Sequence, residues 1–274
     1  MLEAVQGRAR PIACRKRGVA ASLQAGLLIV SLAAPMTVAC QRAPNDPNRG
    51  LDELRTVVES AGGKPTSAEL TRVESRHPKT RAAALARFLR GYLAYSSQDY
   101  KSAADALDAR SIASTTALGD YAFFFRAESK AATGESGAAR RDFGAVHADY
   151  ATSLKAREAK LRAAEVAVAA GDPNTAIEEL SKMAQASDSS ALLITSQAEE
   201  ARGKIEQAIV GYRRIYYDLP ATTAGVNAEA RLVALGASPK NRPGSFEEEL
   251  ARCESIFEAR HYGDAAAAFE QLVA

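Results

Sequence analysis

Large and small hydrophobic residues recur at fixed distances around five turn positions along this chain. A large apolar residue stands ten residues before each turn position, and a small residue stands seven before it. Alanine follows five residues after the turn position, and a large apolar residue follows nine and again twelve after it. The turn positions are Gln98, Gly134, Gly171, Gly203 and Arg260. Of the thirty positions in the pattern, the turns included, 29 match, and only Arg110 departs from it.

This spacing predicts a pair of helices around every turn. Residues three and four apart lie on one face of a helix, so each block predicts a helix, a tight turn and a second helix. A small residue on the first helix and an alanine on the second let the two backbones approach closely, while the large residues fill the grooves beside them. The small residues are Gly91, Ala127, Ala164, Ser196 and Cys253, and the alanines are Ala103, Ala139, Ala176, Ala208 and Ala265. The sequence therefore predicts an all-α fold.

The helical pairs follow one another with a nearly constant period. Successive alanines are 36, 37, 32 and 57 residues apart. The first three intervals resemble the tetratricopeptide repeat (TPR), whose period is about 34 residues, and Pro220 stands where that repeat usually ends its second helix. The long interval predicts an additional helix over about 224–235 and a loop over 236–244. The resemblance implies a right-handed superhelix, an α-solenoid of TPR-like helix-turn-helix repeats, over residues 51–274.

Residues 1–39 have the order of a secretory signal peptide. A basic stretch from Arg8 to Arg17 precedes a mostly apolar run over 19–34, which leads to Thr37, Val38 and Ala39. An uncleaved membrane anchor would need about 20 apolar residues, and Pro35 interrupts this run. We therefore expect export and removal of residues 1–39.

The cleavage position leaves two interpretations open. Thr37-Val-Ala-Cys40 resembles a bacterial lipobox, in which the cysteine becomes the lipidated first residue, although Thr37 stands where leucine is usual. Ordinary cleavage after Ala39 also fits, because residues 37 and 39 are small. The resemblance implies a lipid on Cys40, a periplasmic location and outer-membrane anchoring, with which Gln41 is compatible. Residues 40–50 would then form a polar tether containing prolines.

Charge gives no reason to expect a nucleic-acid partner. Five of the 35 basic residues and one of the 33 acidic residues precede Cys40, so the remainder carries a formal net charge of −2. Nucleic-acid binding requires a clustered basic face. We interpret the pair Glu199 and Glu200, near Arg202, as a solvated helix face.

The residue types that carry chemistry do not assemble into a recognisable site. His77, His147 and His261 lack metal-ligand spacing, and there is no glycine-rich phosphate loop. Cys253 occupies a small-residue position, which indicates a packed thiol rather than a nucleophile. We therefore predict no catalytic, cofactor-binding or metal-binding residue and no cofactor.

The aromatic residues offer two candidates for a groove surface. At helical spacing most of the rings in Tyr216-Tyr217 and Phe123-Phe124-Phe125 must point into the stack of helices. We expect Tyr217 or Phe125 to be the ring that faces a groove.

One stretch resembles a family of envelope enzymes. Residues 208–220 (Ala-Ile-Val-Gly-Tyr-Arg-Arg-Ile-Tyr-Tyr-Asp-Leu-Pro), 228–232 and 257–262 look like the helical region of soluble lytic murein transglycosylases. In that family an alanine-rich superhelix precedes a catalytic domain that cleaves peptidoglycan. Its catalytic acid is the glutamate of a Glu-Ser pair followed by a Gly-Leu-Met-Gln-like segment. None of the five Glu-Ser pairs of this chain is followed by such a segment, so no catalytic residue is transferred.

These observations favour two functions over a third, an enzyme acting through this chain alone, for which no acid-base or nucleophile constellation is present. The first is a non-catalytic scaffold of the bacterial envelope, the superhelical part of a lytic murein transglycosylase acting in peptidoglycan turnover. The alternative is a stand-alone TPR lipoprotein that binds protein partners in outer-membrane assembly or envelope maintenance. The expected partners are thus envelope proteins, peptidoglycan or both. Because the repeat pattern reaches Leu272 without a polar capping helix, we expect a further part of the protein or a partner to cover the last pair.

Overall fold

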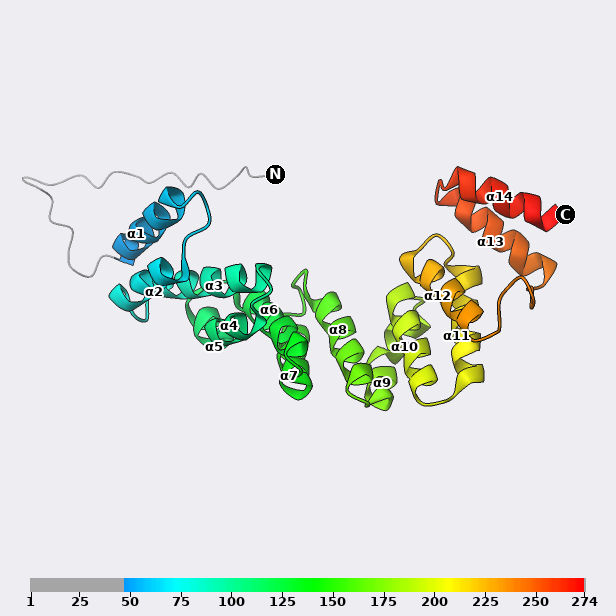
Figure 1. Ribbon diagram of the computed structural model, residues 1–274, viewed down its shortest axis with the longest axis horizontal. Coiled ribbons are helices and arrows are strands. Elements are labelled where there is room, and N and C mark those ends of the chain that lie inside the picture. Colours follow the sequence, from blue (N-terminus) through cyan, green and yellow to red (C-terminus); the bar gives the residue numbers. More distant parts are fainter. Residues whose placement is uncertain (1–46, 274) are drawn as a thin grey trace, which may run out of the picture. The chain divides into compact units, whose positions relative to one another are not determined.

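The computed structural model describes residues 47–273, which form fourteen α-helices and no strand (Figure 1). The predicted signal peptide and Cys40 lie outside the described residues. The all-α helical-repeat fold is confirmed. The helices are α1 (Pro47–Ser60), α2 (Ser67–Arg76), α3 (Arg81–Ser96), α4 (Tyr100–Ala106), α5 (Ala109–Thr115), α6 (Gly119–Ala132), α7 (Ser136–Asp149), α8 (Ala156–Ala169), α9 (Pro173–Gln185), α10 (Ser189–Ala201), α11 (Ile205–Asp218), α12 (Thr223–Ala234), α13 (Phe246–Glu258) and α14 (Tyr262–Val273).

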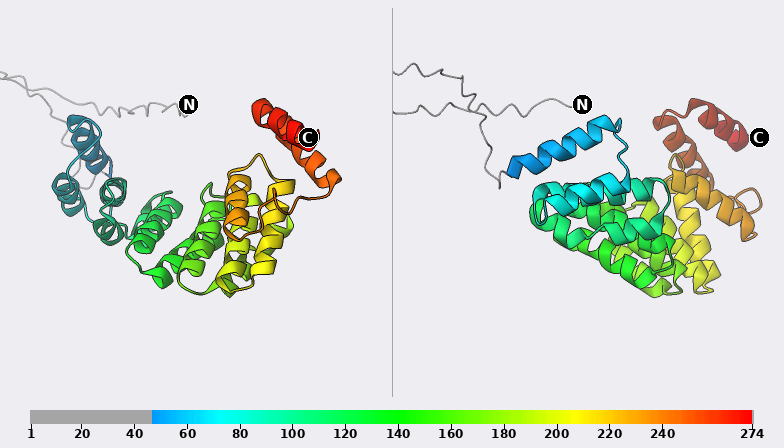
Figure 2. Two further views of the ribbon diagram at one scale, coloured as in Figure 1. Left: turned by 45° about the vertical axis from the view of Figure 1, so that its right-hand side comes forward. Right: turned by 60° about the vertical axis from the view of Figure 1, so that its left-hand side comes forward.

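The helices pack in the order in which they occur along the chain. The five predicted pairs are α3 with α4, α6 with α7, α8 with α9, α10 with α11, and α13 with α14. The second helix of one pair also packs on a helix of the next, as α4 does on α6 and α7 on α8. The colours in Figures 1 and 2 accordingly run without interruption from α1 to α14. Packing between sequence neighbours is what defines a solenoid.

Every predicted turn position has a left-handed backbone. The φ angles are 63° at Gln98, 83° at Gly134, 79° at Gly171, 74° at Gly203 and 65° at Arg260. A left-handed residue after the last turn of a helix ends it, because the amides that follow bond back to its free carbonyls. After α6, for example, the amide of Glu135 donates to the carbonyl of Lys130 at 2.8 Å. Glycine adopts this conformation without steric cost, whereas Gln98 and Arg260 adopt it under strain.

The small residues mark the closest approach within each pair. All five small residues and all five alanines of the pattern are buried. A Cβ atom added to Gly91 would lie 2.5 Å from Cγ of Leu107, and one added to Gly211 would lie 2.2 Å from Oγ of Ser196. The small position on the first helix of a pair therefore faces the residues that stand eight and nine after the turn position. Cys253 occupies this position in the last pair, and its burial confirms the predicted packed thiol.

A break in one helix explains why Arg110 departs from the pattern. The second helix of the first pair, α4, ends at Ala106, and Leu107 remains fully buried. The carboxylate of Asp108 then accepts the amide of Ser111 and caps a new helix, α5. Arg110 lies in α5 and is exposed, so no apolar side chain is needed there.

The additional helix and the loop of the long interval are confirmed. Helix α12 spans Thr223–Ala234, and α13 begins after Ser245, which forms a capping box with Glu248. Helix α1 begins at Pro47, inside the segment interpreted from sequence as a tether.

The interpretation of Glu200 as part of a solvated face is wrong. Its carboxylate accepts the hydroxyl of the buried Tyr212 at 2.9 Å and pairs with the Arg231 guanidinium, thereby joining α10, α11 and α12. Glu199 pairs with Arg202, three residues further along the chain, at 3.1 Å.

Enlarging the alanine of the third pair tests the close contact. We expect Ala176→Leu to lower the free energy of unfolding by about 1–3 kcal/mol, because the fully buried position has no space for the added carbons. The control is Ala230→Leu on the exposed face of α12, which should unfold with the parent protein. Denaturant unfolding measures both, and equal midpoints for Ala176→Leu and the parent would show that the contact is not close.

A pair of glycine substitutions tests the left-handed turns. Gly171 has open space around an added Cβ but a φ of 79°, so Gly171→Ala should destabilise the protein by about 1 kcal/mol through backbone strain alone. Gly144 also has open space but lies within α7, so Gly144→Ala should stabilise it by about 0.5–1 kcal/mol. Thermal and denaturant unfolding of both variants should show shifts of opposite sign. Shifts in the same direction would contradict a left-handed backbone at Gly171 and a helical one at Gly144.

Candidate functional site

Apolar, aromatic and charged side chains form a row across α1, α3, α6 and α8. We call this row the first-helix face, because α3, α6 and α8 are the first helices of their pairs. Two hollows lie on it, one between α1 and α3 and one between α3, α4, α6 and α8. The face comprises Leu51, Leu54, Val58, Leu85, Tyr92, Tyr95, Tyr121, Phe125, Glu128, Arg162 and Glu165.

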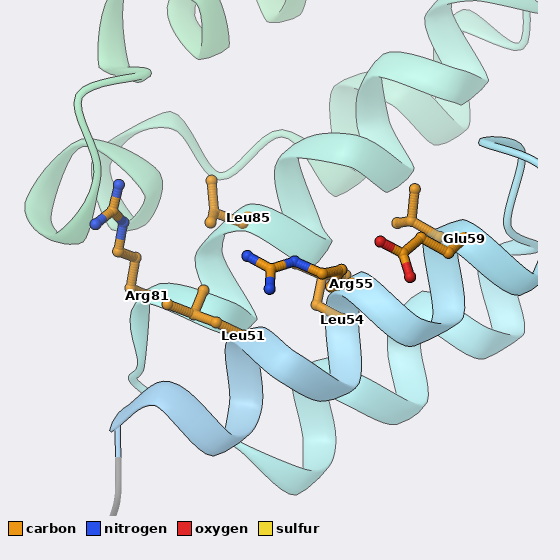
Figure 3. A pocket seen from close by; sticks show the side chains of 7 residues that line it. Leu51, Leu54, Arg55, Glu59, Arg81 and Leu85 are labelled. Atoms are coloured by element: carbon orange, nitrogen blue, oxygen red, sulfur yellow. The ribbon is translucent and has the colours of Figure 1, made fainter. Parts of the chain in front are cut away.

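The hollow between α1 and α3 is mainly apolar and has a volume of about 420 Å³. Figure 3 shows Leu51 and Leu54 on α1 and Leu85 on α3 around it. Arg55, Glu59 and Arg81 stand beside these side chains (Figure 3). An apolar floor with a charged rim is the usual composition of a surface that binds apolar side chains.

Aromatic rings continue the row from α3 to α6. Phe125 of α6 contacts two tyrosines of α3, with ring centroids 5.1 Å from Tyr92 and 5.0 Å from Tyr95. Tyr95 also contacts Tyr100 of α4 at 5.9 Å, and burial raises the pKa of the Tyr95 phenol above its ordinary value. The Tyr92 side is the open part of the cluster, since 40% of this residue is exposed. Tyrosine combines apolar ring faces with a polar tip, which suits a contact surface.

The second hollow has a volume of about 410 Å³, lies at the α8 end of the row and is lined by charged side chains. The Arg162 guanidinium donates from Nε and Nη2 to the two carboxylate oxygens of Glu128, at 2.6 and 3.0 Å. Its Nη1 donates to Glu165, one turn along α8. These bonds raise the pKa of Arg162, so the guanidinium keeps its charge.

The same interhelical position carries either rings or charges along the face. Tyr92 directly follows the small residue Gly91, and Phe125 stands two residues before the small residue Ala127. Glu128 and Arg162 stand at the same two offsets from Ala127 and Ala164. The Tyr92–Phe125 contact and the Glu128–Arg162 ion pair are therefore equivalent contacts in successive interfaces. The sequence therefore marks the face at two positions of each repeat, the one directly after the small residue and the one two residues before it.

Of the two aromatic candidates, Phe125 lies on the face and Tyr217 does not. Tyr217 is buried, and its hydroxyl donates to Glu249 at 2.9 Å, tying α11 to α13. Burial, together with this bond, raises the pKa of Tyr217 to about 12.

The histidines are separated in the fold. His77 pairs with Glu53 at 2.8 Å and His261 with Asp264 at 3.7 Å, while His147 is exposed on α7. Among residues 47–273 there is no group of three or more histidine, cysteine and acidic side chains able to hold a metal ion.

Two comparisons with known proteins found no match. No protein-family model matches the chain, and no curated protein matches it. None of the helices in the described part is long and apolar enough to cross a membrane. The first-helix face is therefore interpreted from its own chemistry.

Proposed function

We propose that this protein is a non-catalytic helical-repeat scaffold that binds a protein partner along the first-helix face. The observation that supports this is the continuity of the face. Apolar side chains on α1 and α3 lead through the Tyr92–Phe125 contact to the charged hollow beside α8. A row that combines apolar anchors with charged positions offers a polypeptide both affinity and register.

The proposed location is the bacterial cell envelope. It rests on the sequence of residues 1–40, where a basic stretch, an apolar run and Thr37-Val-Ala-Cys40 follow one another. In this proposal the protein is exported to the periplasm, and a lipid on Cys40 anchors it to the outer membrane. The partner is then another envelope protein, and the role is outer-membrane assembly or envelope maintenance.

Photocrosslinking at the face tests partner binding. We expect a benzophenone amino acid in place of Tyr92 to give a discrete adduct in the source cells, because this ring is exposed between the two hollows. The matched control is the same amino acid at Val210, which is 69% exposed but lies on α11, away from the face. The adduct should be lost when Leu51→Ser removes an apolar side chain from the first hollow.

Mass spectrometry identifies the crosslinked protein. No adduct at Tyr92, or the same adducts from both positions, would contradict partner binding at this face.

A second candidate is the superhelical part of a lytic murein transglycosylase. The observation that favours it is the resemblance of residues 208–220, 228–232 and 257–262 to that family's helical region. In that role the scaffold would position the catalytic domain and the glycan strand in peptidoglycan turnover.

The size of the native protein separates the two candidates. An immunoblot of the source cells with antibodies to residues 51–274 should show a band far above 29.0 kDa if the transglycosylase candidate holds. A band slightly below 29.0 kDa contradicts that candidate and agrees with a processed, stand-alone scaffold. A chain expressed with its signal segment blocked from cleavage provides the size standard.

A further inference from the structure

The hollow between α6 and α8 contains an excess of negative charge. Two carboxylates, Glu128 and Glu165, share one guanidinium, that of Arg162. These three are the charged residues among those that line the hollow. The hollow therefore carries a formal charge of −1.

The carboxylate that Arg162 binds less completely is that of Glu165. Both oxygens of Glu128 accept hydrogen bonds from Arg162. Only Oε2 of Glu165 is bonded to Arg162, and its other oxygen accepts no hydrogen bond from any residue within 47–273. The Glu165 side chain is 40% exposed, so this oxygen is accessible to a donor from solvent or from a ligand.

Apolar groups and aromatic rings complete the hollow. Ala131 and Ala132 of α6 and Val166 of α8 line it beside the two carboxylates. Tyr95 and Tyr100 line it from α3 and α4, with an angle of 63° between their rings. The faces of such rings attract cations, by about 0.5–1 kcal/mol at an exposed site.

This combination fits one kind of side chain. Lysine and arginine have an apolar stem and a charged end, and the stem prefers apolar surface while the charge remains near water. We propose that the hollow binds a lysine or arginine side chain of the partner, with the stem against Ala131, Ala132 and Val166 and the cation between Glu165 and the two tyrosines. This deepens the proposed function, since it names the side chain that the partner places at the charged end of the first-helix face.

The backbone arrangement agrees with this assignment. The backbones of α8 and α10 pack on each other more extensively than those of α3 and α6, and those of α6 and α8 pack least of these three pairs. Side chains alone, chiefly Glu128 and Arg162, close the space between α6 and α8. The hollow of about 410 Å³ occupies this interface.

An NMR titration tests the site with a minimal probe. N-acetyl-lysine methylamide is added to the protein up to tens of millimolar, and N-acetyl-norleucine methylamide, which keeps the stem but lacks the charge, is the comparison. We expect saturable shifts of the amides around residues 131–132 and 165–169 with the lysine probe only. Absent shifts, or equal shifts with both probes, would overturn the proposal.

Two variants locate the interaction. Glu165→Gln should weaken binding of the lysine probe about 2- to 5-fold, as expected for a partly exposed charge pair. Tyr100→Leu keeps the bulk of the side chain, removes the aromatic face and should weaken binding about 2- to 5-fold. Glu206→Gln, an exposed position on α11, is the control and should bind like the parent. An unchanged amide spectrum elsewhere shows that each variant is folded.

The probe titration can fail independently of the crosslinking experiment that tests the proposed function. Probe affinity that is equal in Glu165→Gln and the parent overturns the lysine site, and the Tyr92 adduct would still support partner binding. Probe binding without a Tyr92 adduct supports the site and contradicts the proposed partner interaction along the face.

Discussion

The close approach of two helix backbones at a small residue is the contact on which the rest of this structure depends. Where Gly91 faces Leu107, even one added carbon would overlap the leucine side chain. The same holds where Gly211 faces Ser196. Because a protein interior is close-packed, such a contact sets the distance between the helices and so the position of every other side chain on them. Each pair of helices repeats this constraint with different large residues around it.

The left-handed turn supplies the second constraint, and together the two place the first-helix face. The turn brings the second helix back against the first, and the second helix then packs on the first helix of the next pair. The residue directly after the small residue of one pair thereby lies opposite the residue that stands two before the small residue of the next pair. The chain uses that juxtaposition for rings between α3 and α6 and for an ion pair between α6 and α8. The first contact stabilises by burying apolar surface, whereas the second keeps charge at the surface.

The sequence predicts the elements of this fold better than the contacts between them. The period of the apolar residues is a local property, so it predicts the five pairs, the turns and the helix α12. The break after Ala106 depends on the Asp108 cap competing with helix continuation, and the apolar pattern does not report that competition. The sequence does not reveal that Glu200 joins helices, because its partner Arg231 lies 31 residues further on, in a helix outside the repeat pattern. The face was only partly foreseen, through Phe125, because its contacts join different repeats.

The stability of this solenoid is a sum of contacts between neighbouring helices, and the most direct test of this is hydrogen exchange along the whole chain. A helix with neighbours on both sides should exchange its amides slowly, because opening it breaks two interfaces. We expect the slowest exchange in α6 to α11. We expect faster exchange in α14, which packs only on α13 within the described residues. Equal protection throughout, or slowest exchange in α14, would contradict this dependence on neighbouring helices.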